Sequence, residues 1–156
     1  ILIVAKTREY AQLFTSLFRI RKIHKIYIAV VYGQVSKELK ILEDDLTLYE
    51  KERKIVQKAT SYIKVLKSNS EYSLLELKPI TGRKHQLRKQ LYNIGSSIIG
   101  DDKYYVKRGN DFIKSKNLML HAYEIKFMIN NVKYNFRADF NKEFKDFLIK
   151  KELNIF

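Results

Sequence analysis

The 156-residue chain contains no cysteine, one proline and five glycines. Without cysteine, a disulfide framework and a cysteine-ligated zinc module are both excluded. The scarcity of glycine and proline excludes a collagen-like chain and a flexible linker. No window approaches the roughly 18 consecutive apolar residues that a membrane-spanning helix needs. These absences narrow the possibilities to a globular domain.

The residues that are present favour one folded unit. Hydrophobic residues make up 46% of the chain and include 11 tyrosines and 9 phenylalanines, which excludes a disordered polypeptide. A chain of this length buries roughly two-thirds of its unfolded surface in a single core. Because there is no internal repeat, low-complexity tract or linker, we expect a single domain over residues 1–156.

Positive charge is in large excess, since 31 Lys and Arg residues oppose 17 Asp and Glu for a formal net charge of +14. Such an excess makes a compact domain repel itself, which is usually tolerated where a polyanion is bound. The alternative is passive enrichment of lysine by AT-rich codons. A basic membrane-surface helix is disfavoured because no segment is both strongly basic and cleanly amphipathic. The charge therefore favours a nucleic-acid partner.

The apolar pattern predicts an α+β domain with a mixed, mostly antiparallel sheet and flanking helices. Strands are predicted at residues 1–5, 26–32, 53–66, 71–78, 118–129 and 132–138. Helices are predicted after an N-cap at Thr7 and over residues 83–93 and 141–151. Surface loops are predicted at the acidic residues 36–50 and the polar residues 103–117.

The basic stretch Thr81–Leu91 is the first candidate site. Its apolar residues recur at helical spacing and form the expected core stripe: Leu87, Leu91 and Ile94. Arg88 lies at the shoulder of this stripe, where a guanidinium needs a carboxylate or phosphate partner. Arg83 and Lys84 are expected in the first helical turn, where cations oppose the helix dipole unless an external anion is present. Two interpretations of this stretch therefore stay possible, an anion-binding site and an ordinary solvated basic face.

The segment His24–Tyr27 is the second candidate. On a strand, Lys25 and Tyr27 share one side, so that an ammonium and an aromatic ring together suit a phosphate and a base. The alternative is that the tyrosine simply packs as a half-buried strand residue. His121, in an apolar strand, is expected to be a satisfied core histidine.

No metal site is predicted, because the three histidines lack the spacing of metal ligands. The acidic runs 43–45 and 101–102 have the oxygen ligands that Mg²⁺ takes, but such runs are more typical of solvated loops. A metal-independent nuclease with His24 and His85 as acid and base is a further alternative.

Five blocks, in this order, resemble the RluA-type family of RNA pseudouridine synthases. They are Ile1–Thr7, His24–Tyr27, Thr81–Arg88, Gly100–Tyr104 and Leu120–Ala122. The Thr81–Arg88 block, TGRKHQLR, is the most specific of them. The GDDKY form of the fourth block is most similar to the branch of the family that acts on large-subunit ribosomal RNA.

The resemblance implies conversion of uridine to pseudouridine in 23S-type ribosomal RNA, with no cofactor, metal ion or membrane partner. It implies that Tyr27 packs against the target base and takes the C5 proton, and that Arg88 pairs with a nucleophilic aspartate. It also implies RNA contacts at Lys6, Lys25, Arg83, Lys84 and His85.

In this family the nucleophilic aspartate lies in an H-R-L-D motif directly before the first strand, and residues 1–156 contain no such motif. The chain also begins with Ile on the first residue of an expected core strand. We therefore expect that the N-terminal part of the catalytic domain is missing and that this chain alone is inactive. The alternative is a non-catalytic RNA-binding module derived from the same family. We expect a cytoplasmic monomer.

Overall fold

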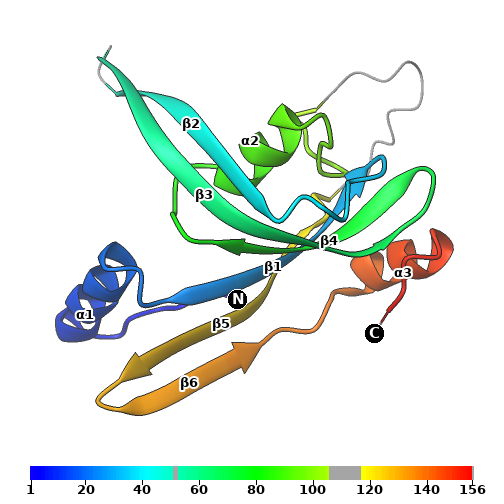
Figure 1. The fold of residues 1–156 in the computed structure, drawn as a ribbon. Coiled ribbons are helices and arrows are strands. Elements are labelled where there is room, and N and C mark those ends of the chain that lie inside the picture. Colours follow the sequence, from blue (N-terminus) through cyan, green and yellow to red (C-terminus); the bar gives the residue numbers. More distant parts are fainter. Residues whose placement is uncertain (51–52, 106–116, 156) are drawn as a thin grey trace.

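The computed structural model describes residues 1–50, 53–105 and 117–155, which form one six-stranded antiparallel sheet with three flanking helices (Figure 1). The strands are β1 (His24–Tyr32), β2 (Ile41–Glu50), β3 (Arg53–Ser68), β4 (Tyr72–Pro79), β5 (Leu120–Ile129) and β6 (Val132–Arg137). The helices are α1 (Arg8–Arg19), α2 (Gln86–Asn93) and α3 (Lys142–Lys150). No helix in these ranges is long and apolar enough to cross a bilayer. The predicted α+β class is confirmed.

The strand order is β2-β3-β4-β1-β5-β6, and each pairing is antiparallel. β1 lies inside the sheet because its β-branched run is apolar on both faces, and residues 28–31 are almost completely buried. Tyr27 lies opposite Leu77 of β4 and Ala122 of β5. The candidate tyrosine is therefore held between two neighbouring strands rather than at an edge.

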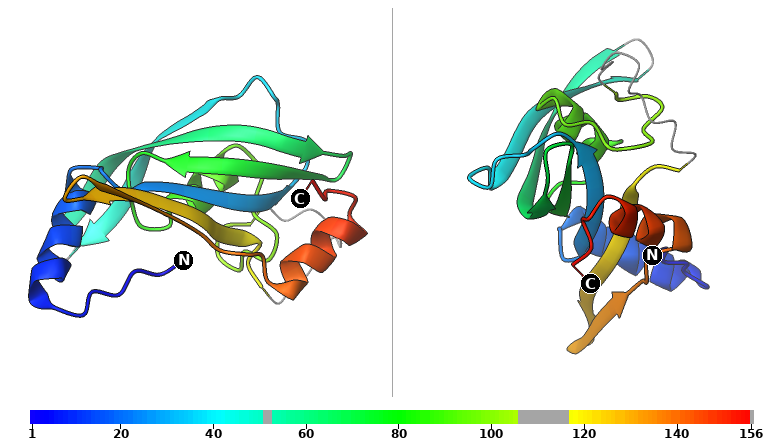
Figure 2. Two further views of the ribbon diagram at one scale, coloured as in Figure 1. Left: turned by 90° about the horizontal axis from the view of Figure 1, so that it is seen from below. Right: turned by 90° about the vertical axis from the view of Figure 1, so that its right-hand side faces the viewer.

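The main core joins the sheet to two of the helices. α2 contributes Leu87 and Leu91, and α3 contributes Phe144 and Leu148. Full burial of one such side chain is worth about 1.5–3 kcal/mol. Ile94, the third residue of the predicted stripe, is 40% exposed because α2 ends one residue before it. α1 and α3 lie at opposite ends of the sheet (Figures 1 and 2).

Short polar side chains fix the turns and helix starts, and Thr7 is the N-cap that the sequence predicts. Thr7 and Asn141 cap α1 and α3 with side-chain oxygens that accept backbone N–H bonds. Asn69 accepts two backbone N–H bonds in the β3–β4 turn. Asn130 and Asn131, with φ of +50° and +61°, form the two-residue turn between β5 and β6. Because these interactions act within a few residues, such turns can be predicted from the sequence.

Residues 1–5 do not form the predicted strand. The Ile1 amino group donates to the Ala122 carbonyl at 3.2 Å, but Leu2 and Val4 are 86% and 74% exposed. A strand needs a row of unpaired backbone groups beside it. β5, the strand that Ile1 contacts, is already paired with β1 and β6. The apolar composition of residues 1–5 was therefore not sufficient to make them a strand.

Residues 41–50 form β2, whereas the sequence predicted a loop throughout 36–50. Leu42 and Leu46 are buried, so one side of this segment packs on the core in spite of the acidic residues between them. β2 is one of the two edge strands of the sheet and pairs with a basic neighbour, β3. Across that ladder the Glu43 carboxylate lies 3.7 Å from the Lys58 ammonium. Charge pairing between two strands cannot be predicted from the sequence of one of them alone.

α2 begins at Gln86, three residues later than predicted. The backbone at His85 is left-handed, with φ of +55°, which interrupts helical geometry. Arg83 and Lys84 therefore precede the helix and do not lie in its first turn. Most of the predicted loop at 103–117 lies outside the described residues.

Candidate active site

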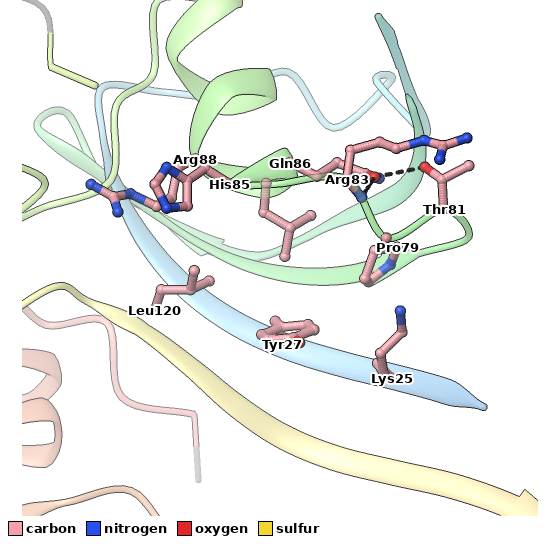
Figure 3. Close-up of a pocket in the computed structure, with 11 residues that line it drawn as sticks. Lys25, Tyr27, Pro79, Thr81, Arg83, His85, Gln86, Arg88 and Leu120 are labelled. Atoms are coloured by element: carbon pink, nitrogen blue, oxygen red, sulfur yellow. Dashed lines mark hydrogen bonds between the residues drawn. The ribbon is translucent and has the colours of Figure 1, made fainter. Parts of the chain in front are cut away.

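A pocket of about 260 Å³ opens between β1 and the segment that leads into α2 (Figure 3). Lys25 and Tyr27 of β1 line one side of it, and Leu120 of β5 lies beside them. The opposite side is lined by the end of β4, the turn that follows it and the start of α2: Pro79, Thr81, Gly82, Arg83, His85, Gln86, Leu87 and Arg88. Two segments far apart in sequence thus share one hollow.

Two buried side chains fix the turn that carries the basic residues. The Thr81 hydroxyl donates to Gln86 Oε1 at 2.6 Å, and that same oxygen accepts the Arg83 N–H at 3.0 Å. The Gln86 amide nitrogen donates to the Thr60 carbonyl and to the Ser61 hydroxyl of β3. Because a buried amide is costly unless it is paired, this network holds the turn in one shape.

Arg88 projects from the first turn of α2 and is paired with an acid that follows that helix. Its Nε donates to Asp101 Oδ2 at 2.7 Å and its Nη2 donates to Asp101 Oδ1 at 2.6 Å. Nη2 also lies 3.1 Å from Asp102 Oδ1. Nη1 donates to no described residue. The guanidinium is therefore held along its Nε–Nη2 edge.

Asp101 is fully buried and held by four hydrogen bonds. Two come from Arg88, and the backbone N–H groups of Lys103 and Tyr104 supply the others at 2.9 and 2.8 Å. Burial alone would raise the pKa of the Asp101 carboxyl, but these hydrogen bonds outweigh burial and lower it. The hydrogen bond with Asp101 correspondingly raises the pKa of Arg88. The pair is ionised at neutral pH.

An aromatic ring lies against this ion pair. The Arg88 guanidinium carbon is 5.1 Å from the centroid of the Tyr104 ring. The Tyr104 hydroxyl is 3.2 Å from His85 Nδ1. Partial desolvation and the nearby cations, Arg88 first among them, lower the pKa of His85. A neutral imidazole therefore faces the pocket at physiological pH.

The two residues of β1 lie on the other side of the pocket (Figure 3). Burial raises the pKa of the Tyr27 phenol and lowers the pKa of the Lys25 ammonium. The Tyr27 hydroxyl makes no hydrogen bond to a described residue. An aromatic face with a polar tip and a cation thus stand opposite a second set of cations, an arrangement suited to one base and its phosphate.

The structure brings most of the predicted site residues together. Tyr27, Arg88, Lys25, Arg83 and His85 line the pocket.

Two predicted contacts lie elsewhere. Lys6 and Lys84 are exposed and do not line the pocket. His24 is also exposed and does not line it, so the two histidines of the nuclease alternative do not share this hollow. His121 packs against Phe140, and its Nε2 lies 3.0 Å from a backbone carbonyl, as expected of a core histidine. Within the described ranges, no group of acids and histidines has the geometry of a metal site.

Asp101, Thr81 and Gln86 are not among the residues predicted to contact RNA or to act in catalysis. The need of Arg88 for an anionic partner was predicted, but its partner lies 13 residues away across a turn. The sequence signal that could have indicated this turn is Gly100, directly before Asp101. Its φ is +77°, and an added Cβ there would lie 2.2 Å from the Asn117 carbonyl oxygen, so that a larger residue does not fit. The glycine allows the chain to turn closely enough to bring Asp101 beneath Arg88.

Comparison with known proteins agrees with this geometry. The model of a protein family described as RNA pseudouridylate synthase matches residues 1–93. The ribosomal large subunit pseudouridine synthase D of Borreliella burgdorferi is 31% identical over 95% of this chain and 47% of its own length. The ribosomal large subunit pseudouridine synthase C of Buchnera aphidicola is 33% identical over 81% of this chain and 44% of its own length.

A third relative is named for a different RNA. The tRNA pseudouridine synthase C of Haemophilus ducreyi is 31% identical over 78% of this chain and 59% of its own length. The chain thus spans about half the length of the curated relatives that it matches. Among solved structures, human RNA pseudouridylate synthase domain containing 4 superposes with a TM-score of 0.78 at 22% identity, covering 96% of this chain and 70% of the human one. That likeness establishes the fold.

Proposed function

The chain belongs to the RNA pseudouridylate synthase family, and from that premise we propose that it carries most of a site that converts uridine to pseudouridine in structured RNA. One observation carries the proposal. Tyr27 and Arg88, to which the family resemblance gives the catalytic roles, line the same pocket. Side chains on opposite faces of the sheet could not have served one nucleotide.

The pocket suits a single nucleotide that has left its stack. Its volume of about 260 Å³ lies just below the range of about 300–1,000 Å³ typical of small-molecule sites. A duplex cannot enter such a space, and enzymes that act on bases within structured nucleic acid generally extrude the target. The net charge of +14 supports a polyanionic substrate.

The proposed reaction is an isomerisation, so no co-reactant is consumed. A carboxylate attacks C1′ of the ribose as the bond between C1′ and N1 breaks, the freed uracil turns, and C5 then bonds to C1′ and displaces the carboxylate. The C5 proton then leaves. Tyr27 packs against the base and accepts that proton as its own hydroxyl proton passes to solvent, and N1 takes up a proton from solvent, while Lys25 and Arg83 contact phosphate.

The attacking carboxylate is assigned to an aspartate outside residues 1–156, because no H-R-L-D motif occurs among them. Arg88 Nη1 is the donor proposed to orient that aspartate. Asp101 is not a substitute nucleophile, since four hydrogen bonds hold it and a carboxylate so held is a poor attacking group. We expect residues 1–156 alone to form no pseudouridine.

Large-subunit ribosomal RNA is the proposed substrate. Two of the relatives described above are named for it, and the GDDKY block supports the same branch. The relative named for tRNA makes tRNA the competing substrate. Transcripts of both kinds, labelled with tritium at uridine C5, distinguish them because the proton at C5 is released on isomerisation.

The complete gene product is assayed on these transcripts with a matched pair of tyrosine variants. Y27F removes the proposed proton acceptor and is expected to slow release by about 10²–10⁴-fold while RNA affinity is retained. Y134F, on β6 and outside the pocket, is expected to keep full activity. Absence of pseudouridine from every transcript, with RNA binding intact, would instead support the non-catalytic binding module.

A further inference from the structure

A second hollow adjoins the candidate active site. It has a volume of about 390 Å³ and lies between the end of α1, the start of β1 and the turn after β4. Four residues line both hollows: Lys25, Thr81, Gly82 and Arg83. The two hollows are therefore adjacent, so that a ligand in the first can extend toward the second.

The second hollow is surrounded by unneutralised positive charge. Arg19, Arg21, Lys25 and Arg83 line it, and no acidic residue is among its described lining. None of these four cations forms an ion pair with a described residue. Four like charges around one hollow repel one another unless an anion binds among them. Arg88, by contrast, is already paired within the fold.

The backbone at Arg21 adds an independent observation. This residue follows the end of α1 in a left-handed conformation, with φ of +59°, and its N–H donates to the Phe18 carbonyl at 3.2 Å. Glycine or asparagine normally takes such a position because a larger side chain is strained there. The arginine is tolerated at a cost in backbone energy, as is common where a side chain is needed for function.

An aromatic ring stands among these charges. Phe18 lines the hollow, remains 46% exposed, and has the Lys25 ammonium 5.8 Å from its ring centroid. Exposed aromatic rings interleaved with cations are the surface that single-stranded nucleic acids bind, because the rings stack on bases and the cations meet phosphates.

We propose that this second hollow binds the nucleotide adjacent to the target uridine in a single-stranded stretch of RNA. Arg19, Arg21 and Arg83 contact its phosphates, and Phe18 stacks on its base. Lys25, at the junction, contacts the phosphate shared with the target nucleotide. This assignment rests on the proposed function, because it takes the first hollow as the uridine site.

Salt-dependent binding of a fluorescent oligouridylate of about ten residues tests the proposal. Between about 50 and 200 mM salt, each phosphate contact on a single strand contributes roughly 0.7 to the slope of log affinity against log salt. R19Q/R21Q is expected to reduce that slope by roughly 0.7–1.4. K142Q/K150Q, which removes two charges from α3 at the other end of the molecule (Figure 1), is expected to leave the slope nearly unchanged.

Two further variants guard against trivial explanations. R21G places glycine where the backbone is left-handed, so the protein should stay at least as stable as the wild type. The slope of log affinity against log salt should nevertheless fall, and unfolding could not then explain the weaker binding. F18A should weaken affinity at least about fivefold with the slope unchanged, because it removes stacking and no charge.

Equal slope reductions in R19Q/R21Q and K142Q/K150Q, or none in either, would overturn the proposal. An unchanged affinity in F18A would overturn its stacking contact. Failure of the proposed function is recognised separately, by the tritium assay on the complete gene product. If no pseudouridine forms but the slope still falls in R19Q/R21Q alone, the hollow is an RNA site without the reaction. If pseudouridine forms but that slope is unchanged, only this assignment fails.

Discussion

Arg88 donates two hydrogen bonds to Asp101, at 2.7 and 2.6 Å, so that the guanidinium and the carboxylate lie edge to edge. The Asp101 side chain is completely buried and the Arg88 side chain is 17% exposed. A two-bond pair restricts the guanidinium to one plane. The orientation of the guanidinium is therefore set by a residue that does not itself line the pocket.

Removal of the Asp101 charge should destabilise the protein strongly. D101N leaves Arg88 with a weaker partner in a buried place, and loss of one partner of a buried ion pair costs roughly 3–5 kcal/mol. We expect the free energy of unfolding in urea to fall by roughly 3 kcal/mol. D102N is the matched control, because the Asp102 side chain is 94% exposed, and should change stability by less than about 0.5 kcal/mol. Equal effects would contradict a structural role for the pair.

Acid should weaken the fold through the same carboxylate. Burial would raise the pKa of Asp101, but the bonds from Arg88 and two backbone amides lower it below the unfolded value. A lowered folded pKa contributes stability above the unfolded pKa of about 3.9, and this contribution is lost as the pH falls through the folded pKa. Stability should thus fall more steeply below about pH 4 in the wild type than in D101N.

Comparing the wild type with D101N isolates the contribution of Asp101 to the pH dependence of stability. The pKa of Glu124 is also lowered, because hydrogen bonds from Lys126 and Arg137 outweigh its burial. Its contribution is present in both proteins and cancels in the difference. Urea unfolding at several acidic pH values measures that difference, and parallel curves for wild type and D101N would show that Asp101 is not held as described.

The glycines at 95 and 100 should respond differently to alanine. Both have left-handed backbones, with φ of +76° and +77°. A Cβ at Gly95 meets nothing within 4 Å, so G95A should cost only the conformational penalty of about 1–2 kcal/mol. A Cβ at Gly100 would lie 2.2 Å from the Asn117 carbonyl oxygen, so G100A should cost a further 1–3 kcal/mol or so for overpacking. Thermal unfolding of the two variants would refute this if their melting points coincided.

The sequence could predict what short-range chemistry determines. Thr7 marked the start of α1 because its side chain accepts the backbone N–H of Tyr10, only three residues away. The alternation of Lys25 and Tyr27 placed both on one side of β1, and both line the pocket. Arg88 was expected to need an anionic partner, because its place beside the core stripe follows from helical spacing alone.

What could not be predicted depends on contacts between distant segments. Residues 1–5 are as apolar as a core strand, yet they find no unpaired edge. β2 is acidic enough to suggest a loop, yet the neighbouring β3 supplies the opposite charge. Asp101 lies in a polar turn, and only the folded chain brings it beneath Arg88. Tertiary pairing overrode composition in each case.

Loss of Arg88 should separate binding from turnover in the complete gene product. R88A removes the group proposed to orient the nucleophilic aspartate, and a misplacement of about 1 Å can cost 10²-fold in rate. We expect tritium release to fall at least about 100-fold while RNA affinity stays near the wild-type value. R88K should recover little activity, because an ammonium cannot form the planar two-bond pair. R8A, on the exposed start of α1, removes the same charge and should retain turnover.

The double variant R88A/D101N keeps this prediction from being confounded by unfolding. R88A alone leaves the buried Asp101 carboxylate unpaired, which by itself lowers stability. Removing both charges relieves that penalty, so the double variant should unfold at a higher urea concentration than R88A. If Arg88 acts by orientation, turnover stays low although stability has recovered. Recovery of turnover together with stability would mean that Arg88 only supports the fold, and a parallel loss of RNA affinity and rate in R88A would mean that it binds substrate instead.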